Sequence, residues 1–192
     1  MGTSQAAKVE THDRILEIAA ARIRRDGAAG LAVAEIMKEA GLTHGGFYRH
    51  FDSREQLVTE AVQRALARGS EWTVASGELG GRQGYTKLVD GYLSGWHRDH
   101  PEAGCGIAGV AADMARDEGA ASDSYTEQVR KCLAVLVDLI DGPDPRTVER
   151  ESLLALSALV GAISIARAVD DPTLSDQLLA DVAAALKDRT EP

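Results

Sequence analysis

Helical spacing of apolar residues is the feature that most constrains the fold of this chain of 192 residues. Ile15, Ala19 and Ile23 share one helical face near the N-terminus, and Gly27 follows two arginines suited to a helix C-terminus. Later segments show similar helical spacing and similar helix-ending residues. No segment shows the sustained alternation of apolar and polar residues that would predict strands. We therefore predict an all-α protein.

The expected helices are separated by glycine, proline and aspartate. They cover residues 11–27, 33–40, 54–70, 85–98, 102–117, 123–140, 146–169 and 174–189. Residues 74–84 hold four glycines and are predicted to form a mobile connection.

Neither the N-terminus nor the later apolar segments suggest targeting or membrane insertion. The first residues lack the basic start and apolar run of a secretory signal, and charges interrupt the later apolar segments. We therefore expect a soluble, cytoplasmic protein. Cys105 and Cys132 do not form a disulfide framework or a zinc-binding pattern, so no metal or other cofactor is predicted.

Charge is distributed unevenly along the chain. Residues 1–56 carry eight basic and eight acidic side chains, whereas the whole chain carries 21 and 30. The entire net charge of −9 therefore belongs to the remainder. The N-terminal part can face phosphate, whereas the rest repels it.

Residues 41–57, GLTHGGFYRHFDSREQL, place two adjacent glycines before three of the eight aromatic residues. A short helix, a glycine turn and a second short helix are the length of a helix-turn-helix. Thr43 is expected to cap the second helix, whose free amides then favour a phosphate or a base acceptor. Ser53 and Gln56 have the spacing of a capping box for the next helix.

The two glycines are poor helix formers, each about 1 kcal/mol worse than alanine. Their bare backbone at Gly45 and Gly46 can come close to a partner, such as a DNA major groove. Phe47 and Phe51, four residues apart, are expected to anchor the helix while the polar residues touch the partner. The alternative is a simple glycine turn followed by a core aromatic pair.

The segments RILEIAAARIRRDG and VAEIMKEAGLTHGGFYRHFDSREQLVTEAV resemble the N-terminal domain of the tetracycline-repressor (TetR) family, over roughly residues 11–62. The resemblance implies a homodimer that holds two such N-terminal domains over successive major grooves of a palindromic operator. It also implies repression until a small-molecule effector binds. We accordingly expect a disordered arm (residues 1–10), a three-helix helix-turn-helix DNA-binding domain (11–56) and a helical ligand-binding and dimerisation domain (57–192).

The family pattern, carried over by position, also implies DNA-contacting residues. Those expected near bases or phosphates are Val33, Ala34, Lys38, Thr43, His44, Gly45, Gly46, Tyr48, Arg49, His50 and Arg54. Some relatives read a guanine with an arginine where this chain has Ala34, and Ile23 replaces a phenylalanine common in that core. We therefore expect His44 and the glycine backbone to set sequence selectivity, and the basic residues to set affinity.

The last two expected helices carry apolar residues on more than one face, so they need cover on two sides. In the family pattern, a symmetry mate supplies the second cover through a four-helix interface. The expected interface residues are Leu153, Leu156, Val160, Gly161, Ile163, Leu178, Leu179 and Val182. The alternative is the internal core of a monomer.

The middle helices hold the expected effector site, because family members bind inducers there. Its candidate residues are Trp72, Tyr92, Trp96, His97, Cys105, Met114 and Tyr125. Large aromatic residues with a few polar groups suit a small apolar effector, whereas Asp90 and Asp113 favour a cationic one. For each candidate, the alternative is a place in the core.

Residues 96–109, WHRDHPEAGCGIAG, bring together two histidines, an aspartate and Cys105. This composition leaves open a metal site, a redox or electrophile sensor at Cys105, and a small buried cysteine. An enzyme using the thiol would need a base in contact and an oxyanion site, and no signature of either is present. We therefore predict no enzyme, and the remaining alternative is a helical module that binds protein instead of DNA.

Overall fold

The computed structural model describes residues 5–68, 77–116 and 120–189, and all regular structure within them is helical. The predicted all-α fold is therefore confirmed. Trp72 lies outside the described residues. The elements are α1 (Gln5–Asp26), α2 (Val33–Glu39), the 3₁₀ helix η1 (His44–Arg49), α3 (Arg54–Arg68), α5 (Gly81–Tyr92), α6 (Gly95–Asp99), the 3₁₀ helix η2 (Pro101–Ala103), α7 (Gly106–Met114), α8 (Ala120–Leu139), α9 (Pro145–Ala168) and α10 (Pro172–Asp188).

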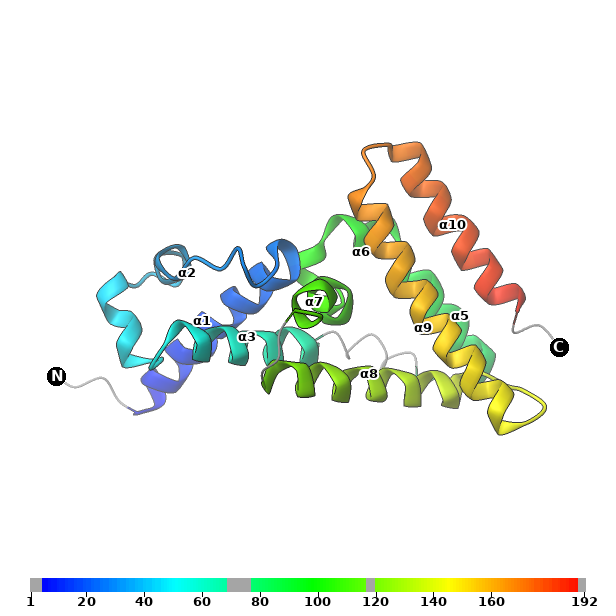
Figure 1. Ribbon diagram of the computed structural model, residues 1–192, viewed down its shortest axis with the longest axis horizontal. Helices are drawn as coiled ribbons and strands as arrows, with labels where there is room; N and C mark the ends of the chain where they lie inside the picture. The colour runs from blue at the N-terminus through cyan, green and yellow to red at the C-terminus, as the bar shows by residue number, and fades with distance from the viewer. Residues whose placement is uncertain (1–4, 69–76, 117–119, 190–192) are drawn as a thin grey trace.

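The helices form a head and a body that share one continuous core. The head, at the left of Figure 1, consists of α1, α2, η1 and α3. In the body, α9 packs against α8 and α10, and α5 packs against all three. α7 contacts α1 and α3 on one side and α8 and α9 on the other, so it joins the head to the body.

α1 begins at Gln5, earlier than the expected start at residue 11. Thr11 is the first residue of the helix expected over residues 11–27 and is of a type able to cap it. It lies inside α1 instead, where its hydroxyl donates to the Ala7 carbonyl at 2.8 Å. Residues 5–10 are thus helical, which differs from the expected disordered arm. The helix ends as predicted at Gly27, whose φ is +76°.

The expected helix over residues 85–98 is divided into α5 and α6. α5 ends at Tyr92, and Ser94 then caps α6 by accepting a hydrogen bond from the His97 amide at 3.1 Å. A serine cap within an otherwise helical pattern thus turns the chain. This turn brings His97 back toward the end of α5, which matters for the polar cluster described below.

Contacts near the C-terminal end of α1 fasten the head to the body. The buried Arg24 guanidinium donates to the Glu102 carbonyl at 2.7 Å and to the Ala65 carbonyl at 3.5 Å. Gly106 allows α7 to lie directly against α3, because a Cβ there would collide with the main chain at Ala65. The head is therefore held against the body by buried main-chain contacts.

Gly41 ends α2 with a φ of +73°, and a Cβ built on it would meet nothing within 4 Å beyond its chain neighbours. Gly41→Ala is therefore opposed by backbone conformation alone and should lower the free energy of unfolding by about 1–2 kcal/mol. Urea titration measures this change. Gly45→Ala is the matched control, because Gly45 has the same open surroundings without a positive φ. Equal losses in the two variants would contradict this explanation.

Candidate functional sites

The second helix of the helix-turn-helix is the 3₁₀ helix η1, which follows the turn at Gly41. Thr43 has the extended backbone of a capping residue, but its side chain makes no capping hydrogen bond, which corrects the expectation. Its carbonyl instead accepts from the Gly46 amide at 2.9 Å. The first turn of η1, residues 43–46, is called the tip below. It is therefore stabilised by main-chain hydrogen bonding.

The two phenylalanines anchor η1 as predicted. Phe47 and Phe51 are 3% and 1% exposed, and their ring centroids lie 5.5 Å apart in a stacked arrangement. The His12 ring of α1 stacks on Phe51 at 4.5 Å. Residue 52 begins the connection to α3, where the Ser53 hydroxyl accepts from the Gln56 amide at 3.1 Å as the capping-box pattern requires.

The exposed side of η1 presents little besides backbone and polar side chains. Gly45 is exposed, and a Cβ built there would meet nothing within 4 Å. His44 and Arg49 are exposed, and Tyr48 is 71% exposed. Nothing in the fold requires a glycine at position 45, so its bareness is available to a partner.

A groove of about 380 Å³ runs between the first turns of α1 and η1. It is lined by Ala7, Lys8, Thr11, Leu42, Thr43, Gly45, Gly46, Arg49 and His50. Lys8 and Thr11 were not predicted as site residues. Lys8 lies before the expected start of the DNA-binding domain at residue 11, and Thr11 was expected only as the first residue of its helix. The helix-forming run upstream of that position is the signal that could have extended α1.

His50 and Arg54 are among the residues expected near DNA, and both side chains also face the head itself. The buried Nδ1 of His50 has no hydrogen-bond partner among the described residues, and burial, with the nearby His12, lowers the pKa of His50. The Arg54 guanidinium donates to the carbonyls of Ala28 and Leu31 at 3.4 and 3.3 Å. Arg54 thus holds the loop between α1 and α2.

Helix α2 supports the tip from behind. Arg22 of α1 pairs with Glu35 at 2.6 Å and also reaches a second glutamate on α2. Of the α2 residues expected near DNA, Ala34 and Lys38 are exposed, whereas Val33 is half-buried against the core. An anchored, exposed second helix behind a glycine turn defines a helix-turn-helix DNA-binding protein.

Comparison with known proteins agrees with this class. Residues 15–61 match the family described as "Bacterial regulatory proteins, tetR family". Two uncharacterized HTH-type transcriptional regulators from strains of Mycobacterium tuberculosis are each 29% identical over 175 residues, covering 85% of this chain and 88% of the relative. The N-terminal part of the chain therefore has the helix-turn-helix of TetR-family DNA-binding regulators, and the chain as a whole is similar to HTH-type transcriptional regulators.

Solved structures show the same fold over the whole length. A TetR regulator from Legionella pneumophila superposes with a TM-score of 0.78 at 17% identity, covering 100% of both chains. One from Cytophaga hutchinsonii gives a TM-score of 0.77 at 18% identity, covering 100% of this chain and 98% of the other. The helical body therefore shares the architecture of these regulators.

A buried polar cluster lies in the body, where α5, α6 and the start of α7 meet. The Cys105 amide donates to Nε2 of His97 at 2.9 Å, and Nδ1 of the same ring lies 2.6 Å from the Tyr92 carbonyl. Nε2 must therefore be the unprotonated acceptor and Nδ1 the donor, so the imidazole is neutral. Burial is the main cause that lowers the pKa of His97 to about 4.

The Tyr92 hydroxyl is the unsatisfied group of this cluster. It is buried without a hydrogen-bond partner among the described residues, and burial, reinforced by the adjacent Cys105 thiol, raises its pKa well above the usual value. A buried hydroxyl without a partner costs free energy that a bound molecule can recover. Tyr92, His97 and Cys105, expected at the effector site, are thus brought together.

Helix α8 supplies further members of the cluster. The Gln128 amide donates to Sγ of Cys132 at 3.6 Å, and both side chains are buried. Burial raises the pKa of Cys132 to about 11, with a smaller contribution from Cys105. Burial and the same two thiols raise the pKa of the half-buried Tyr125. Gln128 and Cys132 were not predicted as site residues, although their spacing of four places them on one helical face.

Other effector-site candidates lie elsewhere. Trp96 is half exposed and stacks on His100, with ring centroids 4.9 Å apart, so it faces away from the cluster. Met114 is buried at the end of α7 and lines a separate hollow beside α3. Asp90 pairs with Lys187 at 2.6 Å. Asp113 accepts from the main chain after α1, so neither acidic residue supports a cationic effector.

Neither a catalytic thiol nor a metal site is supported by the geometry of the described residues around His97. Both ring nitrogens are occupied by main-chain groups, so the imidazole is not placed to act as a base toward the Cys105 thiol. No group of three or more histidine, cysteine or acidic side chains that could hold a metal occurs in the described parts of the chain.

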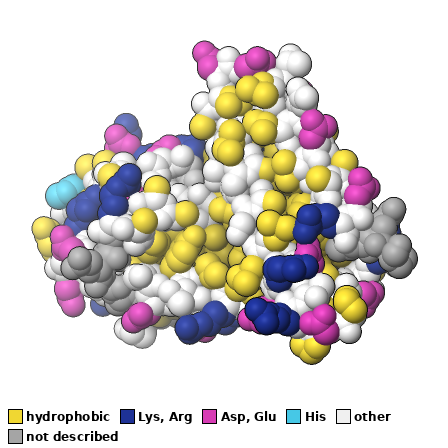
Figure 2. Space-filling view, turned by 45° about the vertical axis from the view of Figure 1, so that its right-hand side comes forward, with side chains coloured by type: hydrophobic (Ala, Val, Ile, Leu, Met, Phe, Trp, Pro, Cys, Tyr) yellow, Lys and Arg dark blue, Asp and Glu magenta, His cyan; other side chains and the backbone are white. Residues whose placement is uncertain are grey.

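The C-terminal helices expose an uncharged face. α9 carries no charged residue from Leu153 to Ala166, and its buried side is opposite to a strip centred on Gly161. Exposed apolar side chains between 43% and 51% accessible include Leu153, Leu154, Ile165 and, on α10, Leu174. Figure 2 shows hydrophobic side chains on the projection formed by these two helices.

The expected interface residues divide between this face and the core. Leu156, Val160, Gly161, Leu178 and Val182 are half-buried, and Leu153 is exposed. Ile163 and Leu179 are 0% and 4% exposed, which corrects their expected place at the interface. They lie on the sides of α9 and α10 that face the protomer's own core, so a partner cannot touch them directly.

His97 should make stability depend on pH. The pKa of His97 is lowered from the ordinary 6.5 to about 4 in the folded chain. The contribution of His97 to the free energy of unfolding is therefore fully present above pH 6.5 and is lost as the pH falls toward 4. Between pH 7 and pH 5 this residue should lower the free energy of unfolding by about 2 kcal/mol. Urea titrations at both pH values measure the decline, which should be smaller in His97→Gln. An unchanged decline would contradict the assignment.

Proposed function

We propose that the protein is a homodimeric repressor that binds a palindromic operator through η1 and releases it when a small effector enters the buried polar cluster. The observation that carries the DNA-binding mode is the exposed Gly45, whose bareness the protein's own packing does not require. A backbone without a side chain can approach the edges of bases in a major groove. The division into a DNA-binding domain (residues 11–56) and a ligand-binding and dimerisation domain (57–192) belongs to this proposal.

The residues around η1 fit two different roles. Lys8 and Arg49 line the groove beside the tip, where they suit phosphate contacts that position the head. His44 is exposed in the first turn of η1, where its ring can read a base edge. Thr43, Gly46, Tyr48 and His50 surround these groups, and Ala34 and Lys38 lie on the supporting helix.

Selection of bound fragments from the source genome tests DNA binding. The wild-type chain should enrich a palindrome, and its affinity should fall steeply with salt. Gly45→Ala should weaken binding to the enriched sequence by about tenfold, because the added methyl group separates the backbone from the groove. It should leave the free energy of unfolding intact.

The matched control for this variant is Gly95→Ala, an exposed first-turn glycine in the body whose Cβ would make only an ordinary contact of 3.7 Å. It should leave DNA binding unchanged. Full affinity in Gly45→Ala would overturn the proposed mode. Absence of any salt-sensitive binding by the wild-type chain would overturn DNA binding itself. That result would favour the alternative of a helical module that binds protein.

The uncharged face of α9 and α10 supports the homodimer. Small residues at its centre, such as Ala158 and Gly161, allow a second helix to approach closely, and apolar residues flank them. α9 is the one described helix long and apolar enough to cross a membrane by length and composition, although core helices pass the same test. In an intracellular regulator, a second copy of the chain is the cover that this face requires.

Ile165→Glu should separate the dimer, because it places a charge within the apolar contact. Light scattering after size exclusion should show at least a tenfold weaker dimer, and operator affinity should fall with it. Val137→Glu is the control, since Val137 is a comparably exposed apolar residue on α8. A dimer equally stable in both variants would place the interface elsewhere.

The effector proposal rests on the unpartnered Tyr92 hydroxyl. A small molecule that supplies a hydrogen-bonding group to Tyr92 and apolar surface to Tyr125 would satisfy the cluster. Because α7 carries Cys105 at its start and contacts both parts of the protein, a change in this cluster can reach the head. An oxidant- or electrophile-sensing role of Cys105 remains an alternative route to the same release.

A further inference from the structure

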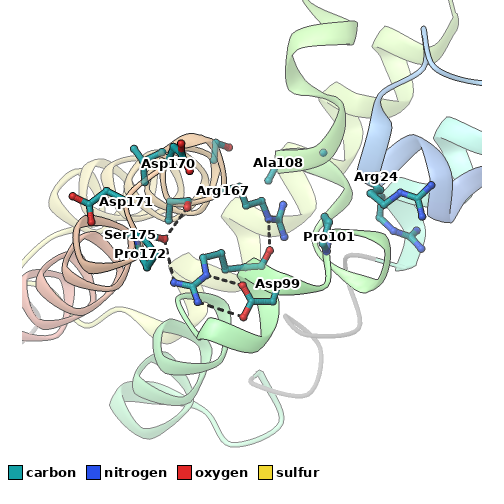
Figure 3. Close-up of a pocket in the computed structure, with 15 residues that line it drawn as sticks. Arg24, Asp99, Pro101, Ala108, Arg167, Asp170, Asp171, Pro172 and Ser175 are labelled. Atoms are coloured by element: carbon teal, nitrogen blue, oxygen red, sulfur yellow. Dashed lines mark hydrogen bonds and ion pairs between the residues drawn. The ribbon is translucent and has the colours of Figure 1, made fainter.

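A second cavity, of about 690 Å³, lies between the head and the C-terminal end of α9. The C-terminal end of α1 forms one wall, α6, η2 and α7 form the floor, and the connection from α9 to α10 forms the opposite wall. Figure 3 shows these walls converging on a gap. The cavity is separate from the groove beside η1 and shares no lining residue with it.

Four arginines line this cavity, and they differ in how their charges are balanced. They are Arg24, Arg25, Arg98 and Arg167. Arg98 pairs with Asp99 at 2.8 Å and with Asp176 at 2.5 Å, so two carboxylates balance it. Arg25 is exposed and pairs with its neighbour Asp26 at 2.7 Å.

Arg167 has a different environment. Its guanidinium donates to the carbonyls of Arg98 and His97 at 3.2 and 2.5 Å, and it makes no ion pair with a carboxylate among the described residues. Burial lowers the pKa of Arg167, which reflects the cost of desolvating its charge. Figure 3 shows this guanidinium pointing into the gap toward Pro101 and Ala108.

No described carboxylate that lines the cavity forms an ion pair with Arg167, although the charge of the nearby Glu102 acts on it. Asp99 is engaged with Arg98, and the Asp171 carboxylate accepts from the amides of Thr173 and Leu174 as the cap of α10. Asp170 remains on the α10 side of the gap. An anion is therefore directed toward Arg167 and the α1 wall, away from Asp170.

We propose that this cavity binds a small organic oxyanion, a carboxylate or a phosphate ester, held mainly by Arg167 and assisted by Arg25. A guanidinium fork matches the two oxygens of either group, and a half-buried guanidinium that no described carboxylate pairs with forms strong hydrogen bonds to an anion. The volume accommodates more than a single inorganic ion, so the oxyanion is one group of a larger molecule.

Such a ligand would touch both parts of the protein. Arg24 and Arg25 belong to the same helix that carries Lys8 at its other end, beside η1. Occupancy would therefore link the position of α1 to the connection between α9 and α10. Binding at the site does not depend on the proposed repressor function, whereas any effect on DNA affinity does.

Titration of the full chain at constant ionic strength tests this site. Acetate, succinate and citrate represent the carboxylates, inorganic phosphate and glycerol phosphate represent the phosphates, and sodium chloride and glycerol are the controls. Calorimetry should detect saturable binding of at least one series, with a matching rise in the melting temperature. The stronger series identifies the source of the oxyanion. Failure of both series to bind more than chloride would overturn the proposal.

Substitutions then locate the bound oxyanion. Arg167→Gln should weaken binding by about tenfold, and Arg25→Gln, which removes an exposed charge without touching the core, by about threefold. Asp170→Asn should strengthen it. Arg146→Gln is the matched control, because it removes the same charge from the opposite end of α9 and should have no effect.

Two outcomes would contradict the placement. Binding that Arg25→Gln and Asp170→Asn leave unchanged would show that the oxyanion lies elsewhere, even if Arg167→Gln unfolds the chain. An equal loss in Arg146→Gln would show general charge attraction only. In both cases the selection of operator fragments is unaffected, so the failure of this inference is distinguishable from the failure of the proposed function.

Discussion

The stacking of Phe47 on Phe51 is the interaction on which the surface proposed to face DNA depends. A 3₁₀ helix of six residues with two glycines has little intrinsic stability, since its hydrogen bonds are poorly aligned and its glycines are flexible. The two buried rings supply the missing stability from the inner side. The outer side is thereby free to remain bare, and this combination of a fixed position with an open surface is what a groove-reading element needs.

The same part of the molecule shows why the two domains cannot be treated as independent. The proposed boundary between residues 56 and 57 falls inside α3, which packs on α1 and also on α7 and α8. Arg24 adds a hydrogen bond from α1 to the Glu102 carbonyl in η2. A movement of the body therefore reaches the head through packed helices, without a flexible hinge among these contacts.

Local signals made much of this structure predictable from the sequence. Apolar spacing indicated the helical class, Gly27 and Gly41 indicated two helix ends, and the aromatic pair indicated that η1 is anchored in the core. Features that depend on competing signals were predicted less well. Ser94 divides a segment that reads as one helix, and helix-forming residues before Thr11 extend α1 past an expected cap.

The residues of the body required tertiary information. Ile163 and Leu153 are both apolar residues of α9, yet one is buried and the other exposed, because only the packing of neighbouring helices decides which side faces inward. Likewise, the polar cluster gathers residues from α5, α6, α7 and α8, and their pairing follows from the turn at Ser94. The sequence provided the candidates, whereas the fold selected among them.

The neutral His97 ring cross-links the segment between α5 and α7 in the way a disulfide would, but without a covalent bond. Its two nitrogens reach main-chain groups on both sides of α6, so this segment keeps its path only while the ring carries a single proton. A second proton would remove the acceptor for the Cys105 amide. The segment between α5 and α7 is thus held by a reversible, pH-dependent cross-link, and acid would loosen the body at this point.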